Sequence, residues 1–177
     1  MKKFELTDEF VTNVFGKKLF RIKALVAFGN VEKGELGGFI EKEDNLSHGG
    51  NAWVSGNAWV FGNAQVSGDA RVSGNAQVSG DARVSGNAQV FGNAWVSGNA
   101  QVFGNADYAV VTGFGRYFRA TTFFRCKDKI LRIQCGCFYG DLAQFREIVK
   151  KTHGDSKYAK EYLAIADLME LHFSDEC

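Results

Sequence analysis

The middle of the chain repeats one pattern of apolar and polar residues every six positions. From Gly50 the sequence reads GNAWVS GNAWVF GNAQVS GDARVS GNAQVS GDARVS GNAQVF GNAWVS GNAQVF GNA, which is nine complete hexads and part of a tenth. In each hexad an alanine and a valine lie two positions apart, so both point to the same side of an extended segment. An amphipathic helix would need a period of about 3.6 residues. The pattern therefore predicts a short strand followed by a corner in every hexad.

The corner falls on the glycine of each hexad and on the Asn or Asp that follows it. Glycine takes positive φ without steric cost, and Asn and Asp are frequent turn residues. A single coil of this kind cannot bury its own apolar side, whereas a stack of coils can. We therefore predict a solenoid over residues 50–106. Ile40 and Leu46 keep the six-residue phase of Ala52, which extends the expected repeat towards the N terminus.

The repeat resembles that of hexapeptide-repeat proteins, in which valine and a small residue recur at the spacing of Val54-Ser55-Gly56-Asn57-Ala58. The resemblance implies a left-handed parallel β-helix with three hexads in each triangular turn. The segments GGFIEKEDNLS and GNAWV, with the strands and helices expected after the repeat, look like hexapeptide-repeat proteins of bacteriophages and prophages. This second resemblance implies a phage-encoded protein that acts in the cytoplasm of the host cell.

Three hexads in a turn would stack chemically similar side chains in columns. Asn51 would lie beside Asp69, whose carboxylate can accept hydrogen bonds from amides above and below without a metal ion. Arg71 would have the carboxylate of Asp69 and the ring of Trp53 as neighbours. Residues 50–105 contain only four charges, and we interpret them as structural.

One of the three outward faces of this solenoid carries two tryptophans and no charge. Its aromatic residues are Trp59, Phe61 and Trp95. Exposed aromatic residues gathered on an uncharged surface are typical of an interface. We therefore expect this face to bind a partner, or a second copy of the chain in a homo-oligomer (a dimer or trimer). The alternative is that the terminal segments fold back over it.

The segments before and after the repeat are expected to close the two ends of the solenoid, which would otherwise expose open backbone. Residues 1–49 form the N-terminal cap, with short strands at KFELT and KLFRIKAL. Residues 107–177 form a small α+β domain. It begins with a β-hairpin, in which YFRATTFFRC and ILRIQCGCF flank residues 127–129.

Two helices complete the C-terminal domain. The first spans Leu142–His153, because Asp141 and Gln144 form a capping-box pattern before it and Gly154 is suited to its end. The second spans Ser156–Phe173. The predicted fold class is thus mainly β, a left-handed parallel β-helix with caps, followed by an α+β domain.

The segment 116–132 concentrates positive charge. Its candidate partner-binding residues are Arg116, Arg119, Arg125 and Lys127. Because aromatic residues lie between these cations, the hairpin could contact nucleic acid, a nucleotide or an acidic protein surface. A solvated hairpin edge, guarded by cations against aggregation, would have the same composition.

The cysteines offer a weak metal site. Cys135 and Cys137, with Cys126 across the hairpin and His153 on the helix, could bind zinc, but their spacing differs from that of zinc knuckles. Alternation along a strand sends Cys135 and Cys137 to the same side, where thiols pack well, so we favour core packing. A disulfide between Cys126 and Cys135 is geometrically open but disfavoured in a reducing cytoplasm.

The chain lacks the residues that catalysis on this scaffold would need. Acyltransferases with a similar repeat use a histidine base, but no histidine lies between His48 and His153. His48 is the one candidate base for such an acyltransferase. Because it stands outside the repeat, we predict instead a protein without catalytic residues, metal or cofactor. No apolar run approaches the roughly 20 residues that cross a bilayer, so no membrane contact is expected.

These observations predict a non-enzymatic interaction protein. Its expected partner is a host protein or protein–nucleic-acid complex. Inhibition of host defence, as by anti-CRISPR proteins, and sequestration of a nucleotide signal both suit the phage resemblance. The alternatives are a hexapeptide-type acyltransferase and a virion or scaffold component.

Overall fold

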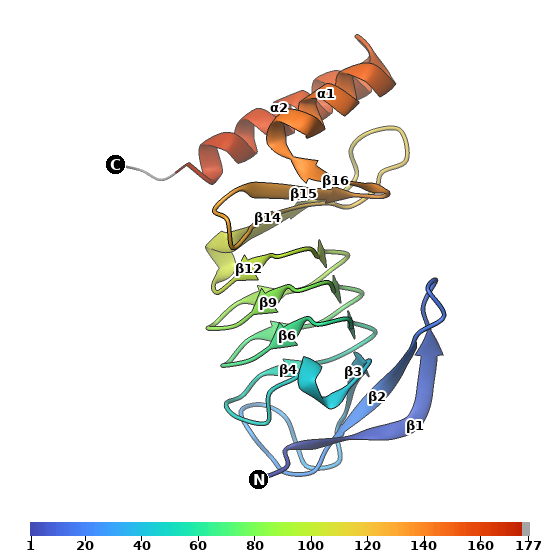
Figure 1. The fold of residues 1–177 in the computed structure, drawn as a ribbon, viewed down its shortest axis with the longest axis vertical. Coiled ribbons are helices and arrows are strands. Elements are labelled where there is room, and N and C mark those ends of the chain that lie inside the picture. Colours follow the sequence, from blue (N-terminus) through green and yellow to red (C-terminus); the bar gives the residue numbers. More distant parts are fainter. Residues whose placement is uncertain (175–177) are drawn as a thin grey trace.

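Each of the nine hexads contributes one two-residue strand to a parallel β-solenoid of about four turns (Figure 1). The computed structural model describes residues 1–174. The strands are β4 (Trp53–Val54), β5 (Trp59–Val60), β6 (Gln65–Val66), β7 (Arg71–Val72), β8 (Gln77–Val78), β9 (Arg83–Val84), β10 (Gln89–Val90), β11 (Trp95–Val96) and β12 (Gln101–Val102). Every third strand pairs in parallel, so Val54 lies beside Val72 and Val72 beside Val90. The predicted solenoid is confirmed.

The alanine and valine of every hexad fill the interior of the solenoid. Val72 and Val78 are both 0% exposed, as predicted, and each such side chain contributes about 1.5–3 kcal/mol through burial. The corners need glycine for two reasons. Gly80 has φ +66°, and a Cβ atom there would lie 2.9 Å from the backbone nitrogen of Gly98 in the next turn.

The solenoid begins before the regular hexads. Strand β3 (Leu36–Ile40) pairs in parallel with β5, and Leu46 forms a bridge with Val66. Ile40 pairs with Val60, 20 positions along the chain, whereas Val60 pairs with Val78, 18 positions along. The predicted phase of Ile40 and Leu46 is therefore wrong: both occupy valine columns, because Leu46 and Val54 lie eight positions apart instead of six, so this turn has two extra residues after Leu46.

An antiparallel hairpin forms most of the N-terminal cap. Strands β1 (Phe4–Thr12) and β2 (Lys18–Ala24) pair with each other, and β2 pairs antiparallel with β3. The hairpin thus extends the sheet that continues through β5, β8 and β11 (Figure 1). Each strand overlaps all but one residue of the segment that the sequence predicted as a strand.

A four-stranded antiparallel sheet covers the other end. It consists of β13 (Tyr108–Val111), β14 (Thr121–Arg125), β15 (Leu131–Cys135) and β16 (Phe138–Asp141). The predicted hairpin is its central pair, but β13 and β16 were not predicted. Successive residues of β14 face opposite sides, so Phe124 joins the solenoid core and Phe123 joins the core beneath the helices.

Helices α1 (Leu142–His153) and α2 (Lys157–His172) lie on the outer face of this sheet (Figure 1). The bounds of α1 match the prediction, and Asp141 and Gln144 form the predicted capping box. Ser156 caps α2 by accepting a hydrogen bond from the Ala159 backbone. Within residues 1–174, no helix combines the length and apolar character that a bilayer span requires.

Side chains form hydrogen bonds with the open backbone groups at the two ends of the solenoid, as donors at one end and as acceptors at the other. At the N-terminal end, Lys3 and Asn45 donate to backbone carbonyl groups of the first regular turn. At the C-terminal end, oxygen atoms of Asn105, Asp107 and Thr122 accept from backbone N–H groups of the last turn. The caps therefore supply the hydrogen bonds that a further turn would have made.

Candidate interaction site in the C-terminal domain

The predicted aromatic face of the solenoid is largely covered by the N-terminal cap. Phe61 is 7% exposed and packs with Leu19 and Phe39, and Trp59 packs against the same cluster. Trp95 is half-buried at the other end, where its backbone N–H donates to Thr122. The expectation of an open aromatic surface is therefore wrong for Phe61, because the cap folds back over it.

The two aspartates of the solenoid accept hydrogen bonds from asparagines of the preceding turn. Asp69 accepts a hydrogen bond of 2.9 Å from the amide of Asn51, and Asp81 accepts one of 3.1 Å from Asn63. These contacts between successive turns agree with the predicted columns.

The four predicted cations of the basic segment do not form one surface. Arg125 lies 3.5 Å from a carboxylate oxygen of Asp107, donates to the carbonyl of Phe173 and stacks over its ring. Lys127 lies beside the solenoid, where its backbone N–H donates to Asn99. Arg116 and Arg119 precede β14 and lie in the loop that connects it to β13. The predicted basic hairpin is thus divided: Arg116, Arg119 and Arg125 lie on the helix side of the sheet, whereas Lys127 lies on the solenoid side.

The loop of residues 112–120, here called the arginine loop, exposes both charge and aromatic surface. Arg116, Tyr117, Phe118 and Arg119 are all exposed, and Tyr117 and Phe118 retain 64% and 68% of their surface. The guanidinium carbons of Arg116 and Arg119 lie 5.5 and 5.1 Å from the Tyr117 ring centre. Within residues 1–174, no carboxylate forms an ion pair with Arg116 or Arg119.

The arginine loop is held against α2. The Gly115 backbone donates a 2.9 Å hydrogen bond to Glu161, and the Tyr162 hydroxyl donates to the carbonyl of Phe114. A side chain at Gly115 would collide with that hydroxyl, so this position requires glycine. Phe118 has φ +54°, a left-handed conformation that is costly for an aromatic residue and is concentrated at functional sites.

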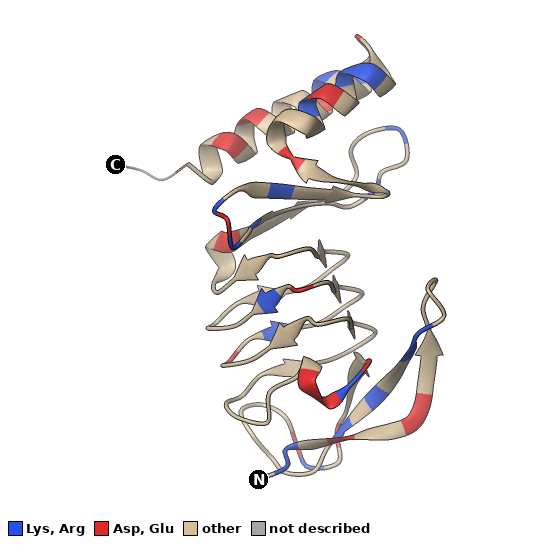
Figure 2. Ribbon diagram, in the orientation of Figure 1, with Lys and Arg blue, Asp and Glu red and all other residues tan. Residues whose placement is uncertain are grey.

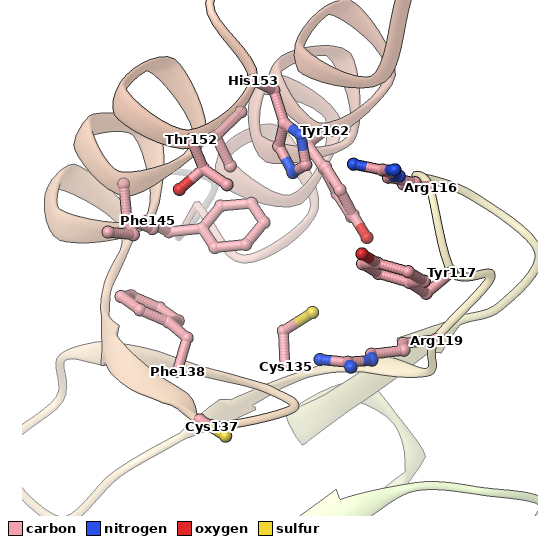
Figure 3. A pocket seen from close by; sticks show the side chains of 12 residues that line it. Arg116, Tyr117, Arg119, Cys135, Cys137, Phe138, Phe145, Thr152, His153 and Tyr162 are labelled. Atoms are coloured by element: carbon pink, nitrogen blue, oxygen red, sulfur yellow. The ribbon is translucent and has the colours of Figure 1, made fainter.

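A cavity of about 250 Å³ lies between the arginine loop, the two helices and the turn from β15 to β16 (Figure 3). Phe138 and Phe145 form one side of it, and Arg116 and Arg119 lie on the opposite side. Thr152 and His153 add polar groups from the end of α1. Among the residues that the structure describes, no Asn, Gln, Asp or Glu side chain lines this cavity.

Tyr162 lines the cavity as a neutral phenol. Burial, more than the neighbouring Cys135 thiol, raises the pKa of Tyr162 to about 12, although Arg119 opposes the shift. The ring of His153 stacks on Tyr162 with a centroid distance of 5.8 Å. The phenol therefore remains a hydrogen-bond donor at neutral pH.

The cysteines are separated by the sheet. Cys126 is buried in the solenoid core, and burial raises its pKa to about 11. Cys135 packs on the helix side, so no disulfide can join the two. Cys137 is exposed, contrary to the expected core packing, because Gly136 begins a turn where β15 ends. Among the described residues, no His, Cys, Asp and Glu group is placed to hold a metal ion; Cys177 lies outside them.

His48, the candidate base, is part of the N-terminal cap. Its Nδ1 atom accepts a hydrogen bond of 3.1 Å from the Lys3 backbone, and its ring stacks on Phe4 at 4.3 Å. These contacts give the imidazole a structural role.

The sequence did not reveal the cavity, because its residues come from four separate segments. Ile148 was one signal: it falls on the apolar stripe of α1, yet it is 38% exposed where it lines the cavity. Gly113 and Gly115 were a second signal of a tight loop, since paired glycines allow positive φ. Both adopt it here, in the first half of the arginine loop.

One comparison with known proteins supports the fold. A family described as YdcK Beta solenoid repeat matches residues 64–80, 76–90 and 88–104. No curated protein matches the chain. The matched residues lie within the solenoid, so the chain contains a β-solenoid repeat similar to that of this family.

Proposed function

We propose that this protein is a non-enzymatic interaction protein that contacts a host protein through the arginine loop and the adjoining cavity. The observation that carries the proposal is the pair of exposed arginines around Tyr117, which form no ion pair with any carboxylate of residues 1–174. Arginine, tyrosine and other large aromatic residues such as tryptophan are enriched at the centres of protein interfaces. This position replaces the covered face around Phe61 as the contact site.

The solenoid would act as a rigid spacer between its two caps. Its repeat resembles hexapeptide-repeat proteins of phages, which supports action in the cytoplasm of an infected cell. Inhibition of a host defence protein, in the manner of anti-CRISPR proteins, suits such a protein because it requires binding alone. A homo-oligomer remains part of the proposal, to be tested by light scattering.

Binding without catalysis fits the side chains that the scaffold offers. The solenoid presents Asn, Gln and Ser, which do not act as bases near neutral pH, and its carboxylates Asp69 and Asp81 accept hydrogen bonds from asparagine amides; His48 is held by the N-terminal cap. An acyltransferase would need a base beside a bound acyl donor.

The test is capture of partners from infected host cells with matched variants. The parent and a Phe91→Ser/Phe103→Ser control, changed at exposed aromatics of the solenoid, should retain the same partner. A Tyr117→Ser/Phe118→Ser variant with unchanged circular dichroism should lose it. Retention by the loop variant at parental yield would remove the C-terminal domain from the contact site.

A further inference from the structure

We infer that the cavity beside the arginine loop binds a polypeptide segment of the partner in which an acidic residue adjoins a bulky apolar one. The cavity can have this role only if the C-terminal domain is the contact site, as proposed above. The carboxylate would meet the arginines, and the apolar side chain would enter the cavity.

The charge of the site calls for an anion. Arg116 and Arg119 lie on one side of the cavity without a carboxylate partner in the described part of the chain, and the nearby Glu161 already accepts from Gly115. Lys150 and Lys151 add positive charge to the last turn of α1, the helix whose Thr152 and His153 line the cavity, and blue segments mark the Lys and Arg positions along the ribbon (Figure 2). Arginine binds carboxylates with two parallel hydrogen bonds, which fixes orientation as well as charge.

The opposite wall calls for a hydrocarbon group. Phe138, Phe145 and Ile148 offer aromatic and aliphatic surface, and 38% of Ile148 remains exposed there. A cavity of about 250 Å³ is smaller than the usual pocket for a whole drug-sized ligand, so it suits one large side chain.

A polypeptide fits these features better than a nucleotide does. Up to residue 174, the apolar wall has no Asn, Gln, Asp or Glu side chain that could pair with the polar edge of a base. Phe118 is 68% exposed and does not line the cavity, so a ligand that covers it must extend beyond the cavity. A segment of chain can fill the cavity and cover Phe118 together.

The probes are blocked, fluorescently labelled peptides with Glu-Phe-Glu, Gln-Phe-Gln or Glu-Ala-Glu at the centre of a Gly-Ser sequence. Fluorescence anisotropy should show binding of the first, with at least about tenfold weaker binding of the other two, a loss of about 1.4 kcal/mol each. Affinity for Glu-Phe-Glu should fall with added salt.

Three variants assign the contacts. Arg119→Gln should weaken Glu-Phe-Glu about tenfold but leave the weak Gln-Phe-Gln binding unchanged, because the lost ion pair is absent there. Ile148→Ser should weaken Glu-Phe-Glu and spare Glu-Ala-Glu. Lys127→Gln, which removes one charge from the other side of the sheet, should bind as the parent does. Unchanged melting temperatures would establish that each variant is folded.

The outcomes separate the inference from the proposed function. Equal affinity for all three peptides, or displacement of Glu-Phe-Glu by adenosine monophosphate at comparable concentration, would overturn the peptide assignment. If partner capture still depends on Tyr117 and Phe118 in that case, the proposed function stands without it. If capture does not depend on the loop, the proposed function fails whatever the peptides do.

Discussion

The ammonium group of Lys3 lies 2.7 Å from the carbonyl oxygen of Ala52, inside the N-terminal end of the solenoid. It also lies 4.6 Å from the ring centre of Phe28, and the residue is only 3% exposed. A lysine near the chain terminus thus replaces a missing turn of the solenoid, because its donor satisfies a carbonyl that no neighbouring strand reaches.

Replacement of Lys3 by Met should destabilise the protein. Methionine fills similar space but cannot donate, and an unsatisfied buried carbonyl costs about 1–3 kcal/mol. In a chain of this size that corresponds to a melting temperature lower by roughly 2–10 °C. Lys2→Met is the control, since Lys2 forms only an exposed ion pair with Glu43. Equal melting temperatures for both variants would contradict the capping role.

The same lysine should give the protein a distinct pH dependence. Burial lowers the pKa of Lys3 from 10.5 to about 8, so between these values the unfolded chain binds more protons than the folded one. Stability should therefore rise with pH from about 8 to 10.5 through this group. The free energy of unfolding, measured with denaturant, should rise more steeply with pH over this range in the parent than in Lys3→Met. Identical slopes in the two proteins would refute this prediction.

The valine columns should tolerate no charge. Val78→Asp would place an unpaired carboxylate among side chains that are 0% exposed, so we expect a loss of more than about 4 kcal/mol and unfolding of the central turns. Gln77→Glu, one position away on the outside, should change the melting temperature little. The result that would exclude this register is a Val78→Asp protein that melts with the parent.

The tryptophans of the covered face should act in folding rather than assembly. Trp59→Ser/Trp95→Ser should leave the mass measured by light scattering unchanged, because Trp59 packs beneath the N-terminal hairpin. Hydrogen exchange should instead become faster in β1 and β2. A fall in mass with unchanged exchange would restore the interface assigned from the sequence.

The purified protein should release no coenzyme A from acetyl-coenzyme A with amine or hydroxyl acceptors. The reason is that Nδ1 of His48 already accepts the Lys3 N–H and its ring is stacked on Phe4. The decisive contrary observation would be steady turnover in the parent that disappears in His48→Ala.

The sequence predicts those parts of the fold that depend on local repetition. The Ala and Val of each hexad, the bounds of α1 and its Asp141 cap follow from spacing alone, because each involves residues close in sequence. The sequence left open whether a terminal segment covers Phe61, since its burial depends on Leu19 in a hairpin more than 40 positions earlier. The separation of Arg119, on the helix side of the C-terminal sheet, from Lys127, on the solenoid side, required the position of that sheet between the two layers.

The constant pairing of residues 18 positions apart sets the geometry between the two caps. Deletion of residues 69–86 would bring the caps closer by one strand spacing, about 4.8 Å, and leave their mutual orientation unchanged. Deletion of a single hexad would instead rotate the arginine loop to a neighbouring face. The number of hexads therefore sets both the distance between the two caps and the direction in which the C-terminal domain points. Insertion of whole turns would increase this distance without altering either cap.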